Sequence, residues 1–327
     1  MEVKDLKTYF FVRRGIAKAV DGVSFKLDKG KVLGLVGESG CGKSVTAMSI
    51  LRLIPSPPGK IVGGEILFHG QDASGRETAV DLLKLSQKEM RKFRGKQISV
   101  VLQDPMTSLN PVFTIGNQVG EPFRLHEKLS GAALLKKIIE VLKRVRIPNP
   151  EVRIADYPHQ FSGGMRQRVS TAMGIGCNPH LLIADEPTTA LDVTIQAQIL
   201  NLLEDIQEKF GLTYLIISHD LAVVEHVADT IGVMYLGKLV ELAPAESLYA
   251  EAQHPYTRAL LAAVPIPDPD VEVAGEVLGG EVPSPLNPPT GCRFHPRCLL
   301  AKEICLEEEP ELVEITPGHK LACHNFE

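Results

Sequence analysis

Short apolar runs recur along the chain and alternate with segments of helical periodicity. The runs are continuous, which is typical of strands buried on both faces of a sheet. They cover residues 32–36, 98–102, 181–184 and 214–217. Helical patterns between and beside them cover residues 81–94, 116–145 and 194–210. Buried strands separated by helices predict an α/β fold whose mainly parallel sheet is covered by helices on both faces.

Three other regions have the pattern of antiparallel strands. Residues 1–30 alternate apolar and polar positions, residues 63–70 resemble a hairpin arm, and residues 231–241 predict a further hairpin. Further along, residues 265–269 and 283–289 are rich in proline and typical of linkers.

The composition is ordinary for a globular protein, with 44% hydrophobic residues, 23% charged residues and a net charge of −5. No apolar run approaches the roughly 20 residues that cross a bilayer. The first residues lack the apolar core of a signal peptide. We therefore expect a soluble, cytoplasmic protein, and the acidic balance predicts no nucleic acid as its main partner.

A glycine-rich turn follows the first buried run. Residues 37–44 read Gly-Glu-Ser-Gly-Cys-Gly-Lys-Ser and lead into a helical pattern, the context that a GxxxxGK[ST] phosphate loop requires. Glycines let backbone N–H groups point at phosphate oxygens, and the helix dipole favours the anion. Lys43 would reach the outer phosphates, and the Ser44 hydroxyl would ligate magnesium. The predicted nucleotide-binding residues of this loop are Ser39, Gly40, Cys41, Gly42, Lys43 and Ser44.

Carboxylates and a histidine follow two of the later buried runs. Asp185 and Glu186 end the run at 181–184, where the first can join a magnesium shell and the second can orient or deprotonate water. A solvated strand end is the plainer interpretation. His219 follows the last buried run and can hydrogen-bond a γ-phosphate, although a lone histidine is more often structural.

A second anion cradle is predicted just before a helix of small residues. There Ser162, Gly163 and Gly164 offer a hydroxyl and backbone N–H groups at a helix N-terminus. A helix N-cap with a flexible turn would also explain these three residues. We favour the functional interpretation because the same chain carries a phosphate loop.

Together these residues resemble the nucleotide-binding subunit of an ABC transporter. The family's motifs stand in order as Walker A at 37–44, the Q-loop glutamine Gln103, the signature at 161–165, Walker B ending at Asp185 and Glu186, the D-loop Ala190-Leu191-Asp192 and the switch histidine His219. The match covers about residues 1–245. It implies a P-loop NTPase with a RecA-like core sheet, an antiparallel β arm and an inserted helical subdomain. Met165 departs from the family's usual glutamine, which removes one possible contact to nucleotide.

The resemblance also implies roles for these residues. ATP would be hydrolysed with Mg²⁺ held by Ser44, Gln103 and Asp185. Glu186 would be the general base, and His219 would contact the γ-phosphate. The aromatic residue that stacks on adenine is best matched by Phe10, with its neighbours Tyr9 and Phe11 close alternatives.

Three stretches, 102–111, 157–165 and 254–261, look like the dipeptide/oligopeptide importer branch of that family. ATP hydrolysis would then power import of peptides, with nickel or oligosaccharides as alternative solutes. The implied partners are a second ATP-binding subunit, more often in a heterodimer than a homodimer, two membrane permease subunits and, indirectly, an extracellular peptide-binding protein. The chain would lie peripherally at the cytoplasmic face of the membrane, with residues 106–160 receiving a permease helix.

Four cysteines, Cys292, Cys298, Cys305 and Cys323, crowd the end of the chain. In a reducing cytoplasm such a group suggests a metal rather than disulfides. Four thiolates suit tetrahedral zinc or a [4Fe–4S] cluster, and the absence of CxxC pairs lowers the expectation of zinc. Some members of the peptide-importer branch carry an iron–sulfur cluster here, which favours the cluster. Unligated or disulfide-linked cysteines remain an alternative, and His295, His319 and His324 are possible substitute ligands.

These patterns divide the chain into a nucleotide-binding domain at 1–250, with the helical subdomain at about 106–165, and a C-terminal extension at 251–327. Two rival functions remain. One is a non-transport ABC ATPase, which the single cassette and the absence of a long coiled coil make unattractive. The other is a redox- or metal-sensing regulator in which the cysteines are the functional part.

Overall fold

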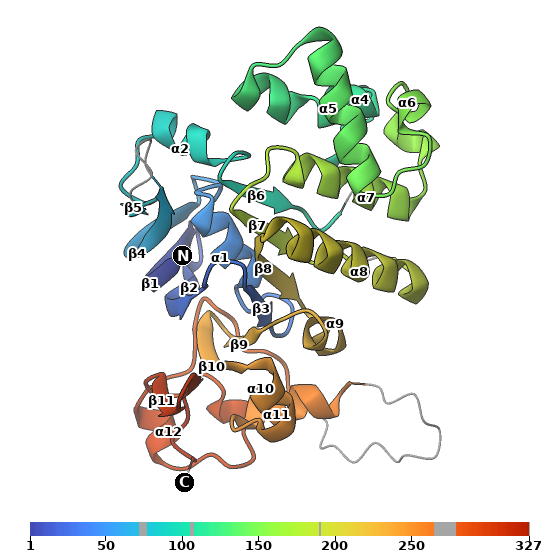
Figure 1. The fold of residues 1–327 in the computed structure, drawn as a ribbon. Helices are drawn as coiled ribbons and strands as arrows, with labels where there is room; N and C mark the ends of the chain where they lie inside the picture. Colours follow the sequence, from blue (N-terminus) through green and yellow to red (C-terminus); the bar gives the residue numbers. More distant parts are fainter. Residues whose placement is uncertain (72–76, 105–107, 190, 265–278, 327) are drawn as a thin grey trace, which may run out of the picture. The chain divides into compact units, whose positions relative to one another are not determined.

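The computed structural model describes residues 1–71, 77–104, 108–189, 191–264 and 279–326 (Figure 1). Its residues form two compact units. The first unit comprises 1–27, 32–84 and the chain from 218 onward, and the second comprises 28–31 and 85–217. The expected boundary at residue 250 stays a prediction.

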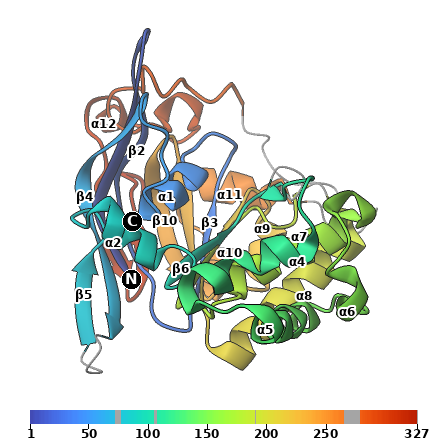
Figure 2. The same ribbon diagram turned by 90° about the horizontal axis from the view of Figure 1, so that it is seen from above.

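An antiparallel arm of four strands belongs to the first unit, in the order β2-β1-β4-β5. Its strands are β1 (Glu2–Val12), β2 (Gly15–Lys26), β4 (Gly59–Gln71) and β5 (Glu77–Asp81). Strands β1, β2 and β4 run side by side in both ribbon views (Figures 1 and 2). The predicted β arm is therefore confirmed.

The first unit also contains the strands that carry the phosphate loop. They lie in the order β11-β12-β10-β9-β3, with β3 parallel to β9 and the other pairs antiparallel. Their bounds are β3 (Val32–Val36), β9 (Thr230–Tyr235), β10 (Lys238–Pro244), β11 (Val313–Thr316) and β12 (His319–Leu321). Strands β9 and β10 are the hairpin that the sequence predicts. Strands β11 and β12, from the cysteine-rich end of the chain, extend the sheet on the β10 side of this hairpin.

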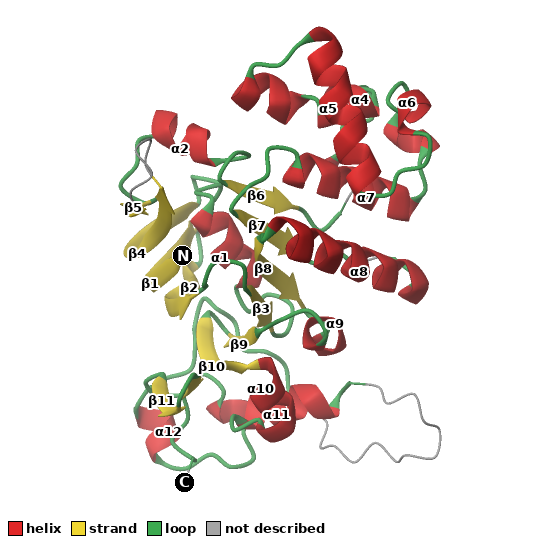
Figure 3. Cartoon of the chain, in the orientation of Figure 1, coloured by secondary structure: helices red, strands yellow, loops and turns green. Residues whose placement is uncertain are grey.

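Helices of the first unit pack beside these strands (Figure 3). They are α1 (Lys43–Ile50), α9 (Leu221–Glu225), α10 (Ala245–Glu251), α11 (Pro255–Ala262), the 3₁₀ turn η3 (His295–Arg297) and α12 (Ile304–Glu307). A close approach between α9 and β3 requires a glycine, because a Cβ on Gly34 would lie 2.2 Å from a methyl carbon of Val224.

The second unit has three parallel strands in the order β8-β7-β6. They are β6 (Ile98–Val101), β7 (Leu181–Asp185) and β8 (Thr213–Ser218), and every residue of β7 and β8 is buried. This burial explains the continuous apolar runs in the sequence, because a strand covered on both faces has no polar side to display.

The remaining elements of the second unit are mainly helical, as the sequence predicts. They are α2 (Gln87–Phe93), α4 (Ile115–Val119), the π-helix η1 (Phe123–Glu127), α5 (Gly131–Arg144), α6 (Pro150–Arg153), the 3₁₀ turn η2 (Pro158–Gln160), α7 (Gly163–Ile175) and α8 (Val193–Phe210).

One predicted helix begins later than expected. The sequence pattern predicts a helix over residues 81–94, whereas Asp81 ends β5 and α2 begins after Ser86. Ser86 and Glu89 form a reciprocal capping box that satisfies the first free N–H groups of the helix. The prediction was wrong because it rested on the spacing of the leucines at 82, 83 and 85, whereas the Ser86–Glu89 capping box determines where the helix begins.

Candidate functional site

The phosphate loop connects β3 to α1 in the first unit. Gly42 is the N-cap of α1 and has a φ of 112°, in the left-handed region that favours glycine. A Cβ at this position would lie 2.3 Å from the carbonyl oxygen of Ala19. The loop backbone therefore requires glycine here for both its conformation and its close approach to β2.

Lys43 folds back over the loop. Its Nζ donates hydrogen bonds to the carbonyls of Gly37 at 2.6 Å and Glu38 at 3.1 Å, and the residue is 4% exposed. A buried ammonium is stabilised by such bonds, and it is held where it can also contact an anion cradled by the loop. Ser39, Gly40 and Ser44 are exposed, so these predicted ligands are accessible. Cys41 is buried, and burial raises the pKa of its thiol.

The second unit brings together two residues that the sequence places 83 positions apart. The Gln103 side-chain amide donates a 2.8 Å hydrogen bond to the Glu186 carboxylate. The Thr189 hydroxyl donates to the same carboxylate oxygen at 2.9 Å. Two donors therefore fix the orientation of a carboxylate that is only partly buried.

The backbone of Glu186 is also fixed. It has a φ of 47°, which is unusual for a residue with a Cβ, and its N–H donates to the carbonyl of Ile217 on β8 at 2.9 Å. Asp185, the last residue of β7, is 5% exposed. The strand end thus presents one buried and one accessible carboxylate, as expected for residues with different tasks.

His219 lies in the first unit directly after β8 and is exposed. The next residue, Asp220, caps α9 by accepting a hydrogen bond from the N–H of Ala222 at 2.9 Å. This cap fixes the start of α9, directly after His219. Its predicted contact with a γ-phosphate stays a prediction.

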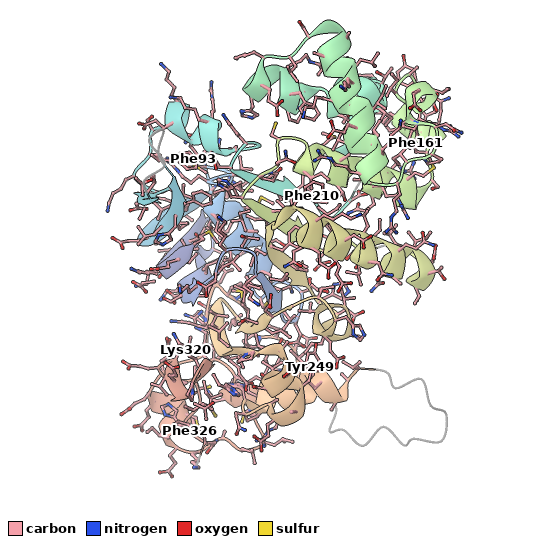
Figure 4. The ribbon with its side chains drawn as sticks, in the orientation of Figure 1. Phe93, Phe161, Phe210, Tyr249, Lys320 and Phe326 are labelled. Atoms are coloured by element: carbon pink, nitrogen blue, oxygen red, sulfur yellow. The ribbon has the colours of Figure 1, made fainter. Side chains whose placement is uncertain are left out.

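Ser162 is the N-cap of α7, where its hydroxyl accepts a hydrogen bond from the N–H of Met165 at 3.3 Å. The preceding Phe161, labelled in Figure 4, is buried. The guanidinium of Arg153 lies 5.8 Å from its ring centroid. The N-cap interpretation of Ser162 is therefore correct as far as local structure goes. It does not exclude the second role, since Ser162 remains exposed.

The two glycines after Ser162 differ in what they permit. A Cβ on Gly164 would lie 2.7 Å from Cγ2 of Ile195 on α8, so this glycine allows α7 and α8 to approach. Gly163 has more room, because a Cβ at this position would lie 3.6 Å from Cδ2 of Leu191, an ordinary van der Waals distance. In the predicted D-loop, Asp192 caps α8 by accepting from the N–H of Ile195, while Ala190 lies outside the described residues.

The three aromatic residues considered for adenine stacking lie on β1. The Tyr9 hydroxyl donates a 2.5 Å hydrogen bond to Asp21, and the Lys18 ammonium lies 5.9 Å from the Tyr9 ring centroid. Phe10 packs against Gly59, and a Cβ at position 59 would lie 2.9 Å from Cε1 of the Phe10 ring. Phe11 is 48% exposed. The choice of Phe10 stays a prediction.

The four C-terminal cysteines lie in the first unit, and the N–H of Cys292 donates to the carbonyl of Cys305 at 2.9 Å. Burial raises the pKa of the Cys292 thiol to about 11, with neighbouring cysteines adding to this effect. Burial also raises the pKa of Cys298 and Cys323.

Within the described part of the chain, no three His, Cys, Asp or Glu side chains are arranged to hold a metal ion. The expected zinc ion or [4Fe–4S] cluster therefore has no support from this geometry. The possible substitute ligands are engaged elsewhere. His295 contacts the carbonyl of Cys292, His319 contacts Glu241 and His324 contacts the carbonyl of Glu308.

Three residues at these sites were not predicted from the sequence: Thr189, Glu38 and Arg297. The contact of Thr189 with Glu186 could have been predicted from the sequence, because a threonine hydroxyl three residues after a carboxylate is close enough to donate to it. The contact between Glu38 and Arg297 could not, since they form a two-bond ion pair across 259 residues of sequence.

Residues 20–189 match the family model described as ABC transporter. Residues 240–305 match a second model, described as oligopeptide/dipeptide transporter, C-terminal region. In the described residues no helix is long and apolar enough to cross a membrane.

Two relatives from Bacillus subtilis match almost the whole chain. Oligopeptide transport ATP-binding protein AppF is 49% identical over 335 residues, covering 100% of this chain and 97% of the relative. Dipeptide transport ATP-binding protein DppD is 45% identical over 326 residues, covering 99% and 93%.

A solved structure also resembles this fold. It is a dimeric, post-hydrolysis state of the ATP-binding cassette MJ0796 bound to ADP and Pi. The TM-score is 0.64 at 26% sequence identity, and the match covers 75% of this chain and 98% of that one.

Proposed function

This chain belongs to the ABC transporter family, and from that premise we propose that it hydrolyses ATP to power the import of di- or oligopeptides through a separate membrane permease. The observation that carries the ATPase part is the Glu186 carboxylate held by Gln103 and Thr189 at the end of β7. The peptide part is supported by the match at 240–305 and by relatives named for oligopeptide and dipeptide transport.

ATP binding is assigned first to the phosphate loop. The ammonium of Lys43 now donates to the carbonyls of Gly37 and Glu38. When ATP binds, it would also donate to oxygens of the outer phosphates. Backbone N–H groups of Ser39 to Ser44 would cradle the phosphates, and the N-terminus of α1 adds its partial positive charge. Phe10 is proposed to stack on the adenine.

Bound Mg²⁺ neutralises phosphate charge in such sites. The residues proposed to hold it are the Ser44 hydroxyl, the Asp185 carboxylate and the Gln103 amide. Hydroxyl, carboxylate and amide oxygens are the donors that Mg²⁺ prefers. The proposal fits Ser44 because this residue is exposed in the first turn of α1.

Glu186 is the proposed general base. Its carboxylate accepts a proton from the attacking water while that oxygen bonds to the γ-phosphorus, and the bond from the γ-phosphorus to the bridging oxygen of ADP breaks. Gln103 and Thr189 orient the carboxylate before the reaction. His219 is proposed to donate a hydrogen bond to the γ-phosphate. Positioning of this kind supplies most of the catalysis in phosphoryl transfer.

The signature residues Ser162, Gly163 and Gly164 are proposed to complete the ATP site of a second subunit. Exposed Ser162 at the N-terminus of the 13-residue helix α7 supports this, because such a terminus attracts phosphate. A heterodimer of two ATP-binding subunits is proposed rather than a homodimer. The isolated chain should then bind ATP but hydrolyse it slowly.

We also propose that the four C-terminal cysteines hold a metal, a [4Fe–4S] cluster with zinc as the alternative. Its support is the crowding of the four cysteines near the end of the sequence. No catalytic step depends on such a metal. Iron and zinc analysis of protein purified without oxygen tests it, since a metal-free and colourless product would remove both candidates.

The function is tested by solute uptake in cells that lack this chain. We expect uptake of a labelled tripeptide to be lost, restored by the wild-type chain and not restored by Glu186→Gln. Nickel and an oligosaccharide are measured in parallel. Loss of nickel or oligosaccharide uptake with unchanged peptide uptake would replace the peptide assignment while leaving the ATPase assignment in place.

A further inference from the structure

Two nearly buried arginines flank Phe294 in the stretch between Cys292 and Cys298. The side chains of Arg293 and Arg297 are 6% and 4% exposed. A guanidinium cannot lose its charge, so burial of this kind requires partners that satisfy it. The partner of Arg297 is a residue of the phosphate loop, and the partners of Arg293 lie on β2 and in the β9–β10 turn.

Arg297 contacts the phosphate loop. Its two terminal nitrogens donate to the two carboxylate oxygens of Glu38 at 2.7 Å and 3.0 Å. The guanidinium also lies 5.8 Å from the ring centroid of Tyr235 on β9. The hydrogen bond to Glu38 is the main reason why the pKa of Arg297 is raised. Paired bonds fix both the position and the orientation of the carboxylate.

A second contact holds the same loop residue. The backbone N–H of Glu38 donates to the hydroxyl of Tyr256 on α11 at 2.9 Å. Glu38 is therefore held by its side chain and its backbone, and both partners come from the C-terminal third of the chain. Since Lys43 bonds to the carbonyl of Glu38, the position of this residue also affects the lysine.

Arg293 reaches the strand beside the loop. It donates to the carboxylate of Asp21 on β2 and to the carbonyl of Leu236 in the β9–β10 turn. In the same turn, the N–H of Gly237 donates to the carbonyl of Cys41 at 2.8 Å. Arg297 thus contacts the loop directly, and Arg293 contacts the β9–β10 turn that hydrogen-bonds to the loop.

The stretch that carries them is itself anchored. Phe294 packs among the rings of Tyr235, Tyr256 and His254, with centroid distances of 5.2, 5.4 and 5.6 Å. It is 2% exposed. Offset and edge-on ring contacts of this kind hold a segment in one orientation.

We propose that Arg297 is a positioning residue for the phosphate loop and that the cysteine-containing segment sets the nucleotide affinity of this protein through the Arg297–Glu38 pair. The inference rests on the proposed binding of ATP by this loop. Glu38 adds a negative charge to a loop that must accept a highly charged anion. Arg297 neutralises that charge and holds it away from the bound phosphates, whereas without Arg297 the carboxylate would repel them.

The test is titration calorimetry of the full-length chain with MgATP. We expect Arg297→Ala to raise the Kd about tenfold, and Arg297→Lys to have a smaller effect because lysine keeps the charge without the paired bonds. Adding Glu38→Gln to Arg297→Ala should recover most of the lost affinity, since it removes the unpaired charge. Arg258→Ala is the matched control, because Arg258 is exposed and donates to the Ala252 carbonyl at 2.7 Å.

Thermal unfolding without nucleotide is measured for each variant. A wild-type Kd in Arg297→Ala would overturn the inference. A raised Kd that Glu38→Gln does not relieve would also overturn it, because the arginine would then act only on general stability. Failure of the wild-type chain to bind MgATP would instead contradict the proposed function.

Discussion

The side-chain amide of Gln103 donates a hydrogen bond to the carboxylate of Glu186 over 2.8 Å. Gln103 follows β6 and Glu186 follows β7, two neighbouring parallel strands. Parallel strands end at the same edge of their sheet, so residues that follow two such strands can meet. This contact makes Gln103 a positioning residue for the proposed base in addition to its proposed contact with Mg²⁺.

Removing that amide should slow turnover more than it weakens binding. We expect Gln103→Ala to lower kcat of the assembled transporter by about 10- to 100-fold, because the carboxylate loses a donor that orients it. The Kd for ATP should change less than threefold. Gln198→Ala is the control, since Gln198 is an exposed glutamine of the same unit that accepts from Arg168. Equal losses in the two variants would contradict the positioning role.

Two glycines of the phosphate loop should respond differently to alanine. A Cβ on Gly42 would lie 2.3 Å from the Ala19 carbonyl oxygen, whereas a Cβ on Gly40 would meet nothing within 4 Å. Both have a positive φ, so Gly40→Ala carries strain alone, roughly 1 kcal/mol. Gly42→Ala adds overpacking, and we expect a loss of about 3 kcal/mol in total. Chemical denaturation measures both, and equal losses would contradict the close approach of the loop to β2.

Acid should destabilise the first unit through His254. This residue is 1% exposed, its Nδ1 accepts a hydrogen bond from the N–H of Tyr256, and burial lowers its pKa to about 3. The unfolded chain binds a proton near pH 6.5 and the folded chain does not until about pH 3. Stability contributed by neutral His254 is therefore complete above pH 6.5 and is lost as the pH falls from 6.5 toward 3.

The His254→Asn variant tests this effect, because asparagine can also cap α11 but does not titrate. Between pH 6 and pH 4 we expect the unfolding free energy of the variant to fall less steeply than that of the wild type, by about 1.4 kcal/mol per pH unit. Exposed His226→Asn should keep the wild-type slope. Identical slopes in all three proteins would mean that His254 does not carry the acid sensitivity.

Much of the fold could be predicted from local patterns. Buried parallel strands are recognisable because β3, β7 and β8 display no polar face, and the hairpin of β9 and β10 is marked by the Leu236-Gly237 turn. The start of α2 was missed because a capping box, rather than apolar spacing, determines it. Strands β11 and β12 are short and partly exposed, so they carry no clear periodic signal.

The candidate site divides in the same way. Lys43, Asp185 and Glu186 stand at fixed distances from buried strands, so the sequence identifies them. Arg297 reaches Glu38 across most of the chain, and only folding brings the two together. The sequence gives the number of C-terminal cysteines but not their positions relative to one another in the fold. The geometry of the described residues gives no support to the metal inferred from them.

Hydrolysis by the Glu186→Gln variant tests the central claim most directly. Glutamine keeps the shape of the side chain and can still accept the hydrogen bond from Gln103, but it cannot take a proton from water at neutral pH. In the transporter assembled with its partner subunits, we predict wild-type ATP affinity and a turnover rate lower by about 10²- to 10⁴-fold. Turnover at the wild-type rate would contradict the account, because Glu186 would then not be the base.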